Sequence, residues 1–362
     1  MPEMEPAPRR ANAPLDGPEG ARPQASTAPL LEARAVSKYF PVPRGGFGSR
    51  ATLKAVDGVS LAIGAKETFA VVGESGSGKS TLGRLIAALE RPTEGDILFE
   101  GRSLWRLGRG ELRMLRRRIQ SIFQDPYSSL DPRFTVREIL SEPWDIHGLH
   151  RDKAERQREL RKLCDLCGIA QGALARYPHE FSGGQRQRIG IARALALKPR
   201  LLVADEPVSS LDVSIQAQIL NLLRDLQREF HLAIVFISHD LSVVRQLANR
   251  TAVMYLGKIV ELAGTEELLA NPQHPYTEAL LSAVPIPDPE PSRRRERLIL
   301  QGDLPSPYDP PPGCGFHPRC RYAQPSCRIQ VPEFAAIAGG RRVACPVRPF
   351  SARSSRAAIP AS

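Results

Sequence analysis

The stretch that decides the fold reads Gly73-Glu74-Ser75-Gly76-Ser77-Gly78-Lys79-Ser80, and Thr81 follows it. It matches the pattern G-x-x-x-x-G-K-[ST] at every fixed position. The apolar run 68–72 before it predicts a buried strand, and the segment 79–89 after it is typical of a helix. A strand, a glycine-rich turn and a helix in this order predict an α/β fold with a phosphate-binding loop.

The residue types in this loop indicate a nucleotide triphosphate as the ligand. Glycines let the backbone N–H groups point at phosphate oxygens, and the helix N-terminus adds positive potential. We expect residues 73–81 to bind ATP, with Lys79 reaching the β- and γ-phosphates and the Ser80 hydroxyl binding Mg²⁺. The alternative, a structural glycine-rich turn, is disfavoured by the strand before it and the helix after it.

A second part of the site is expected after the apolar run 201–204, which predicts another buried strand. Asp205 and Glu206 come directly after this run, at the strand end where α/β sheets bind ligands. We expect Asp205 to bind Mg²⁺ through its hydration shell, and Glu206 to orient and deprotonate the attacking water. For Glu206 alone, the alternative is that it caps the next helix.

Two further polar residues are candidates for the same site. His239 follows the apolar run 233–237 and therefore stands at a third strand end, within reach of a γ-phosphate. A lone histidine in such a place is more often a surface or capping residue. Gln124 precedes a turn in Phe123-Gln124-Asp125-Pro126, and we expect it to orient water or contact Mg²⁺.

A second phosphate-binding element is predicted at Phe181-Ser182-Gly183-Gly184-Gln185. The segment 186–197 after it is typical of a helix, and a hydroxyl with two glycines at a helix N-terminus is suited to an anion. One nucleotide needs only one phosphate-binding loop. The second element therefore indicates a partner chain.

Across residues 31–285 the chain resembles the ATP-binding cassette (ABC) family, with Phe181 where the signature usually has leucine. The resemblance implies ATP hydrolysis and a head-to-tail dimer, in which ATP lies between the loop of one chain and Ser182, Gly183, Gly184 and Gln185 of the other. Asp212, in Ser209-Ser210-Leu211-Asp212, matches the loop that contacts the partner. Phe40 aligns with the aromatic that stacks on adenine, and adjacent Tyr39 is the alternative.

Other stretches resemble the F-type ATPase subunit of dipeptide and oligopeptide importers. They are 124–133, 177–181, 212–218, 274–277, 304–307 and 311–314. This branch implies import driven by ATP, with a homologous D-type ATPase, two membrane permeases and an extracytoplasmic binding protein as partners. The permeases are expected to contact the segment around Gln124 and the helical subdomain. Dipeptides, oligopeptides and nickel complexes all remain open as the solute, as does a homodimer in place of the heterodimer.

Composition and the resemblance together predict the organisation of the chain. Residues 1–30 are rich in Pro and Ala and are expected to be a disordered tail, and 351–362 a second one. Residues 31–285 are expected to form the ABC ATP-binding domain, with a RecA-like core, an antiparallel β subdomain and a helical subdomain at about 133–190. Residues 286–350, rich in Pro, Arg and Cys, are expected to form a separate C-terminal extension.

The net charge of +11 is compatible with a polyanionic ligand, an anionic membrane or nucleic acid. The arginine-rich run 102–118 lacks interleaved aromatics, so we interpret it as a solvated helical face and expect no nucleic-acid partner. No run approaches the roughly 18 apolar residues of a membrane helix. The resemblance therefore implies a peripheral protein on the cytoplasmic face of the cell membrane. The alternatives are a soluble cassette ATPase acting on nucleic acid or ribosomes, and a cassette that binds ATP only for regulation.

Four cysteines in the last fifty residues are candidate metal ligands: Cys314, Cys320, Cys327 and Cys345. A [4Fe–4S] cluster, a zinc site and four free thiols are the alternatives, and the spacing matches neither zinc ribbons nor common ferredoxin runs. Cys164 and Cys167 share one helix face and are expected to be core or surface residues.

Overall fold

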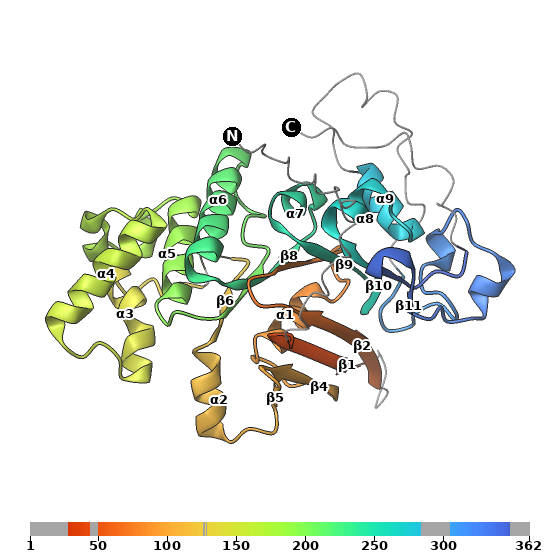
Figure 1. Ribbon diagram of the computed structural model, residues 1–362, viewed down its shortest axis with the longest axis horizontal. Coiled ribbons are helices and arrows are strands. Elements are labelled where there is room, and N and C mark those ends of the chain that lie inside the picture. The colour runs from red at the N-terminus through yellow and green to blue at the C-terminus, as the bar shows by residue number, and fades with distance from the viewer. Residues whose placement is uncertain (1–27, 44–49, 126, 128, 284–304, 348–362) are drawn as a thin grey trace, which may run out of the picture.

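Two β-sheets and a group of helices make up the computed structural model, which describes residues 28–43, 50–125, 127, 129–283 and 305–347 (Figure 1). The predicted tails lie outside these ranges, apart from residues 28–30, of which Leu30 is buried. No helix within the ranges is long and apolar enough to span a membrane.

The core of the larger sheet is parallel and runs in the order β9-β3-β8-β7-β6. Its strands are β3 (Thr68–Val72), β6 (Ile119–Ile122), β7 (Leu201–Asp205), β8 (Ala233–Ser238) and β9 (Arg250–Tyr255). Both faces are covered, which explains why these strands are continuously apolar rather than alternating. In β3, Ala70 and Val72 join the hydrophobic cluster that includes the helices α6 (Val213–Phe230) and α7 (Leu241–Leu247). Phe69 and Val71 join the opposite cluster with α1 (Lys79–Ile86).

An antiparallel sheet covers the α1 side, with the order β2-β1-β4-β5. Its strands are β1 (Leu31–Pro43), β2 (Arg50–Ile63), β4 (Glu94–Phe99) and β5 (Arg102–Ser103). The arginine-rich helix α2 (Arg109–Arg116) comes after β5 in the chain. Leu115 is its one buried residue, which agrees with the prediction of a solvated helical face. The α/β core and the antiparallel subdomain are both as the sequence predicts.

Helices α3 (Val136–His147), α4 (Lys153–Cys167) and α5 (Gly183–Leu195) gather on one side of the molecule (Figure 1). The short 3₁₀ segments η1 (Gln171–Ala175) and η2 (Pro178–Glu180) connect α4 to α5. The indole N–H of Trp144 donates to the carbonyl of Ala196 at 2.8 Å, which ties α3 to the end of α5. Cys164 and Cys167 are buried in this group, as expected of core residues.

The C-terminal part continues the larger sheet instead of standing apart from it. After β10 (Lys258–Gly264) come α8 (Thr265–Ala270), α9 (Pro275–Ala283), η3 (His317–Arg319), η4 (Pro325–Arg328), β11 (Ala335–Ala336), η5 (Ala338–Gly340) and β12 (Arg342–Val343). β12 pairs antiparallel with β10, and Val343 lies opposite Glu261. The buried carboxylate of Glu261 accepts hydrogen bonds from the backbone of Gln273 and His274 and from Arg341. A Pro-rich segment without a large core of its own is thus stabilised by pairing with the cassette.

Candidate nucleotide site

The loop between β3 and α1 is shaped by close backbone contacts. Gly78 has φ +103°, and a Cβ there would lie 2.0 Å from the carbonyl oxygen of Ala55, so no other residue fits. Nζ of Lys79 donates to the carbonyls of Gly73 at 2.8 Å and Glu74 at 2.9 Å. The loop carbonyls therefore surround the ammonium group of Lys79.

The electrostatic setting of Lys79 differs from that of a surface lysine. Its side chain is only 4% exposed, and Nζ lies 4.0 Å from Oε1 of Glu206. Burial lowers the pKa of Lys79, while the carboxylates of Glu206, Asp205 and Glu74 act in the opposite direction. A positive charge held among carboxylates in a buried place is suited to polyanionic phosphates.

Ser80 and Asp205 meet as the sequence predicts. The Ser80 hydroxyl donates to Oδ1 of Asp205 at 3.0 Å. Burial raises the pKa of Asp205, the neighbouring Glu206 adds to this, and the Ser80 hydrogen bond lowers it. A carboxylate and a hydroxyl side by side are hard oxygen ligands of the kind that Mg²⁺ prefers. The two residues therefore fit the expected metal.

Glu206 lies beside the two remaining candidates, Gln124 and His239. Its Oε2 accepts a hydrogen bond from Nε2 of Gln124 at 3.1 Å and lies 3.3 Å from Nδ1 of His239. The backbone of Glu206 has φ +46°, a conformation that costs a non-glycine residue free energy and is concentrated at functional sites. The ends of β6, β7 and β8 thus bring three polar side chains together at one edge of the sheet.

The signature residues lie elsewhere in the chain. Ser182 and Gln185 form a capping box at the start of α5, each accepting from the other's backbone N–H. A Cβ on Gly184 would lie 2.5 Å from Cγ2 of Ile215. Asp212 caps α6 by accepting from the backbone N–H of Ile215 at 3.0 Å. Among the described residues, no hydrogen bond or ion pair joins these four positions to the phosphate-binding loop.

The two candidates for stacking on adenine are adjacent in β1. The hydroxyl of Tyr39 donates to Asp57 at 3.0 Å, and Nζ of Lys54 lies 5.5 Å from its ring centroid. Phe40 is half-buried, and Nζ of Lys38 lies 5.1 Å from its ring centroid. Neither contact discriminates between them, so Phe40 stays a prediction.

Two residues that sequence reasoning missed contact the loop from the C-terminal half. The hydroxyl of Tyr276, on α9, accepts from the backbone N–H of Glu74 at 2.8 Å. Arg319, at the end of η3, donates to both carboxylate oxygens of Glu74 at 2.8 and 3.1 Å. Tyr276 lies in the stretch 274–277 that resembles peptide importers, but that resemblance does not indicate a contact with the loop, and no local pattern marks Arg319. The pairing spans 202 and 245 positions, and only the fold brings them together.

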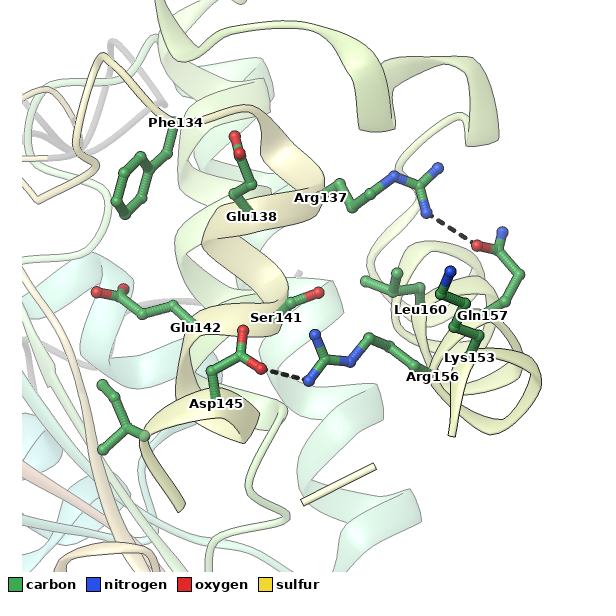
Figure 2. A pocket seen from close by; sticks show the side chains of 11 residues that line it. Phe134, Arg137, Glu138, Ser141, Glu142, Asp145, Lys153, Arg156, Gln157 and Leu160 are labelled. Atoms are coloured by element: carbon green, nitrogen blue, oxygen red, sulfur yellow. Dashed lines mark hydrogen bonds and ion pairs between the residues drawn. The ribbon is translucent and has the colours of Figure 1, made fainter. Parts of the chain in front are cut away.

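Two hollows are notable among the described residues. One of about 510 Å³ is lined by candidate site residues together with exposed apolar side chains, among them Ser80, Leu89, Phe123, Gln124 and Asp205. The other, of about 570 Å³, lies between α3 and α4 (Figure 2). Its walls are charged, and Arg156 pairs with Asp145 while Arg137 donates to Gln157. Only the first hollow reaches residues of the nucleotide site.

The C-terminal cysteines, the candidate ligands of a metal centre, lie near one another. The backbone N–H of Cys314 donates to the carbonyl of Cys327 at 2.8 Å. Burial raises the pKa of the Cys320 thiol to about 11, and the nearby thiols of Cys345, Cys314 and Cys327 act in the same direction. Within the described ranges, however, no three or more His, Cys, Asp or Glu side chains are arranged to hold a metal ion. A [4Fe–4S] or zinc centre therefore finds no support, because nearby thiols do not converge on one point.

Comparison with known proteins agrees with this site. The family model described as ABC transporter matches residues 56–209. The chain is 54% identical to the oligopeptide transport ATP-binding protein AppF of Bacillus subtilis (strain 168), over 87% of this chain and 96% of that relative. The chain belongs to the ABC transporter family. The model of the oligopeptide/dipeptide transporter C-terminal region matches residues 260–327, which places this ABC protein in the peptide branch.

Further relatives and solved structures extend the comparison. This ABC protein is 52% identical to a probable peptide ABC transporter ATP-binding protein of Sinorhizobium fredii, over 88% of this chain and 90% of that one. The dimeric, post-hydrolysis structure of the ATP-binding cassette MJ0796 with ADP and Pi has a TM-score of 0.58 and 29% identity. It covers 65% of this chain and 99% of the solved one.

Proposed function

We propose that this ABC protein hydrolyses ATP to drive the import of dipeptides or oligopeptides through a membrane transporter. The observation that carries the proposal is the position of Glu206, between Lys79 and the side chains of Gln124 and His239. Lys79 and the loop N–H groups bind the phosphates, and Glu206 accepts the proton of the attacking water. Gln124 orients Glu206 and the water, while His239 faces the γ-phosphate. The peptide solute rests on the names of the relatives and on the matched C-terminal region.

Mg²⁺ is part of the proposal, held by the Ser80 hydroxyl and Asp205, with Gln124 as a further candidate. Bound there, the ion would neutralise the charge on the β- and γ-phosphates. Burial raises the pKa of the Asp205 carboxyl, and a cation beside it would favour the charged form and so oppose that effect.

The assembly is proposed as a dimer of cassettes in which Ser182, Gly183, Gly184, Gln185 and Asp212 complete the ATP site of a D-type partner or of a second copy. It is supported by the exposed position of Ser182 and Gln185 at the start of α5 and by the dimeric state of MJ0796. We assign residues 31–285 to the ATP-binding domain, with the helical subdomain at about 133–190, and 286–350 to the extension. Two permeases and a binding protein complete the importer, which places this chain on the cytoplasmic face of the membrane.

The hollow that contains Gln124 is the proposed contact site for a permease. Leu89 and Phe123 on its rim are 51% and 44% exposed, which gives an apolar surface for a helix from a partner. Since Gln124 contacts Glu206 directly, an occupant of this hollow would act on the catalytic carboxylate. Opening of the transporter and hydrolysis would thereby be coupled.

The experiment is reconstitution of the transporter in lipid vesicles from this chain and the partner subunits encoded beside it. ATP-dependent uptake of labelled dipeptides and pentapeptides is measured, with Glu206→Gln as the inactive control. Uptake that needs ATP and Glu206 supports the proposal. ATP hydrolysis accompanied by uptake of a nickel complex alone would overturn the peptide assignment, and hydrolysis stimulated by nucleic acid or ribosomes rather than permeases would overturn the transport assignment.

A further inference from the structure

One side chain of the C-terminal region reaches the phosphate-binding loop. The guanidinium of Arg319 donates two parallel hydrogen bonds to the carboxylate of Glu74, at 2.8 Å to Oε2 and 3.1 Å to Oε1. The arginine side chain is 8% exposed and that of Glu74 is 27% exposed. Bidentate pairs of this kind are stronger and geometrically more specific than single hydrogen bonds.

The surroundings of Arg319 fix it in place. Phe316, the residue just before η3, packs edge-on against Tyr255 at 5.3 Å between ring centroids, and its ring centroid lies 5.4 Å from that of Tyr276. Tyr276 in turn accepts from the backbone N–H of Glu74. The pKa of Arg319 is raised, chiefly by its hydrogen bonds to Glu74. Glu74 is therefore held at its backbone and at its side chain by two elements outside the cassette core.

Glu74 matters because it belongs to the loop that binds phosphate. Its carbonyl accepts from Nζ of Lys79, and its carboxylate is close enough to raise the pKa of that lysine. An unpaired carboxylate there would add negative charge beside the phosphates and would leave the loop free to turn. Arg319 removes both effects.

We propose that Arg319 is a positioning residue of the ATP site, which neutralises Glu74 and fixes the loop in the conformation that binds the triphosphate. The C-terminal region thereby contributes a side chain to the nucleotide site, in addition to pairing with the edge of the sheet. The inference rests on the proposed function only in that the loop binds ATP. It requires neither transport nor a particular solute.

The test measures binding of a fluorescent ATP analogue to the full chain and ATP hydrolysis by the assembled transporter, for Arg319→Gln, Arg319→Lys, Glu74→Gln and the double variant. Arg321→Gln is the matched control, because Arg321 is exposed and lies over the ring of Tyr322 rather than at the loop. We expect Arg319→Gln to weaken ATP binding roughly tenfold, as for the loss of one charged hydrogen-bonded pair. The ATP affinity of Arg319→Lys should lie between those of Arg319→Gln and the wild type, and the affinity of Arg321→Gln should equal that of the wild type.

Two further results separate positioning from a general loss of stability. Because Arg319 and Glu74 act as one unit, the double variant should bind ATP no more weakly than Arg319→Gln alone. Hydrolysis at saturating ATP should stay within about twofold of the wild type, so that KM changes and kcat does not. If Arg319→Gln does not fold, Glu74→Gln carries the test. It breaks the pair but also removes the negative charge, so ATP binding should weaken by a smaller factor, and unchanged affinity would overturn the inference.

Unchanged ATP affinity in Arg319→Gln would overturn the inference, as would losses that simply add in the double variant. A fall in kcat at unchanged KM would overturn it as well. Failure of the wild-type chain to bind the analogue would instead overturn the proposed function, and the inference with it.

Discussion

Nε2 of Gln124 donates a hydrogen bond to Oε2 of Glu206 at 3.1 Å, although 82 positions separate the two residues in sequence. The bond joins the end of β6 to the end of β7, which are neighbouring parallel strands. It also joins the hollow proposed for the permease to the proposed general base. A shift of Gln124 would change which lone pairs of Glu206 are available to water. Through this contact, a permease bound at the hollow would affect ATP hydrolysis.

Glu206→Gln is the first prediction. The change keeps the shape of the side chain but removes the basic carboxylate, so hydrolysis should fall on the order of 10²-fold or more while ATP binding is retained. Single-turnover hydrolysis and binding of a fluorescent ATP analogue would be measured side by side. Glu229→Gln, a change in the last turn of α6, is the control. Near-normal turnover in Glu206→Gln would rule out its role as the base.

Lys79→Ala should act on binding itself. The substitution removes the ammonium group that the loop carbonyls of Gly73 and Glu74 hold in place, so ATP affinity should fall at least about tenfold. Lys162→Ala on α4, where the lysine pairs with Glu159 far from the loop, should leave affinity unchanged. Equilibrium binding of the nucleotide measures both. Equal affinities for the two variants would contradict the phosphate-binding assignment.

Sequence reasoning found the parts of the site that follow from strand ends. Asp205, Glu206 and His239 each follow an apolar run, and the carboxyl ends of parallel strands meet at one edge of a sheet, so their convergence could be predicted. The contacts of Tyr276 and Arg319 with Glu74 could not be predicted from the sequence. Tyr276 stands in the stretch 274–277, which indicates only a resemblance to peptide importers, and Arg319 belongs to no motif. The contacts of both depend on how the C-terminal region packs against β9 and β10.

Other features escaped the sequence for the same reason. The Pro-rich composition after residue 285 predicted an extension, but the pairing of β12 with β10 depends on long-range backbone hydrogen bonds that composition does not encode. Four cysteines in a short segment predicted metal ligands, and this prediction finds no support among the described residues, because spacing alone does not decide whether side chains converge.

Leu89→Arg tests the proposed permease contact. The charge would lie on the rim of the hollow beside Gln124, where Leu89 is 51% exposed, so folding and ATP binding should be unaffected. Assembly with the permeases, measured by co-purification from membranes, should fall at least about tenfold, since a charge facing an apolar partner surface is costly. Ile329→Arg, an exposed change in the C-terminal region and outside both expected permease contacts, is the matched control. Equal loss of assembly in both variants would remove the preference for the Gln124 hollow.

His274 makes acid stability a testable property of the cassette. The residue is 1% exposed, and burial lowers the pKa of its imidazole from 6.5 to about 3. Between these values the unfolded chain binds a proton that the folded chain does not, so the free energy of unfolding falls as the pH is lowered from 6.5 towards 3. Within this window, protonation of His274 in the unfolded chain lowers the free energy of unfolding by about 1.4 kcal/mol for each pH unit. Above pH 6.5 this effect is absent.

His274→Gln should therefore flatten the dependence of Tm on pH between 6.5 and 4, whatever the substitution does to Tm at neutral pH. His179→Gln is the control, because His179 is exposed in η2 and its replacement should leave the slope as in the wild type. Thermal unfolding followed by circular dichroism at several pH values gives the slopes. A slope for His274→Gln equal to that of the wild type would exclude His274, since another group would then bind the proton on unfolding.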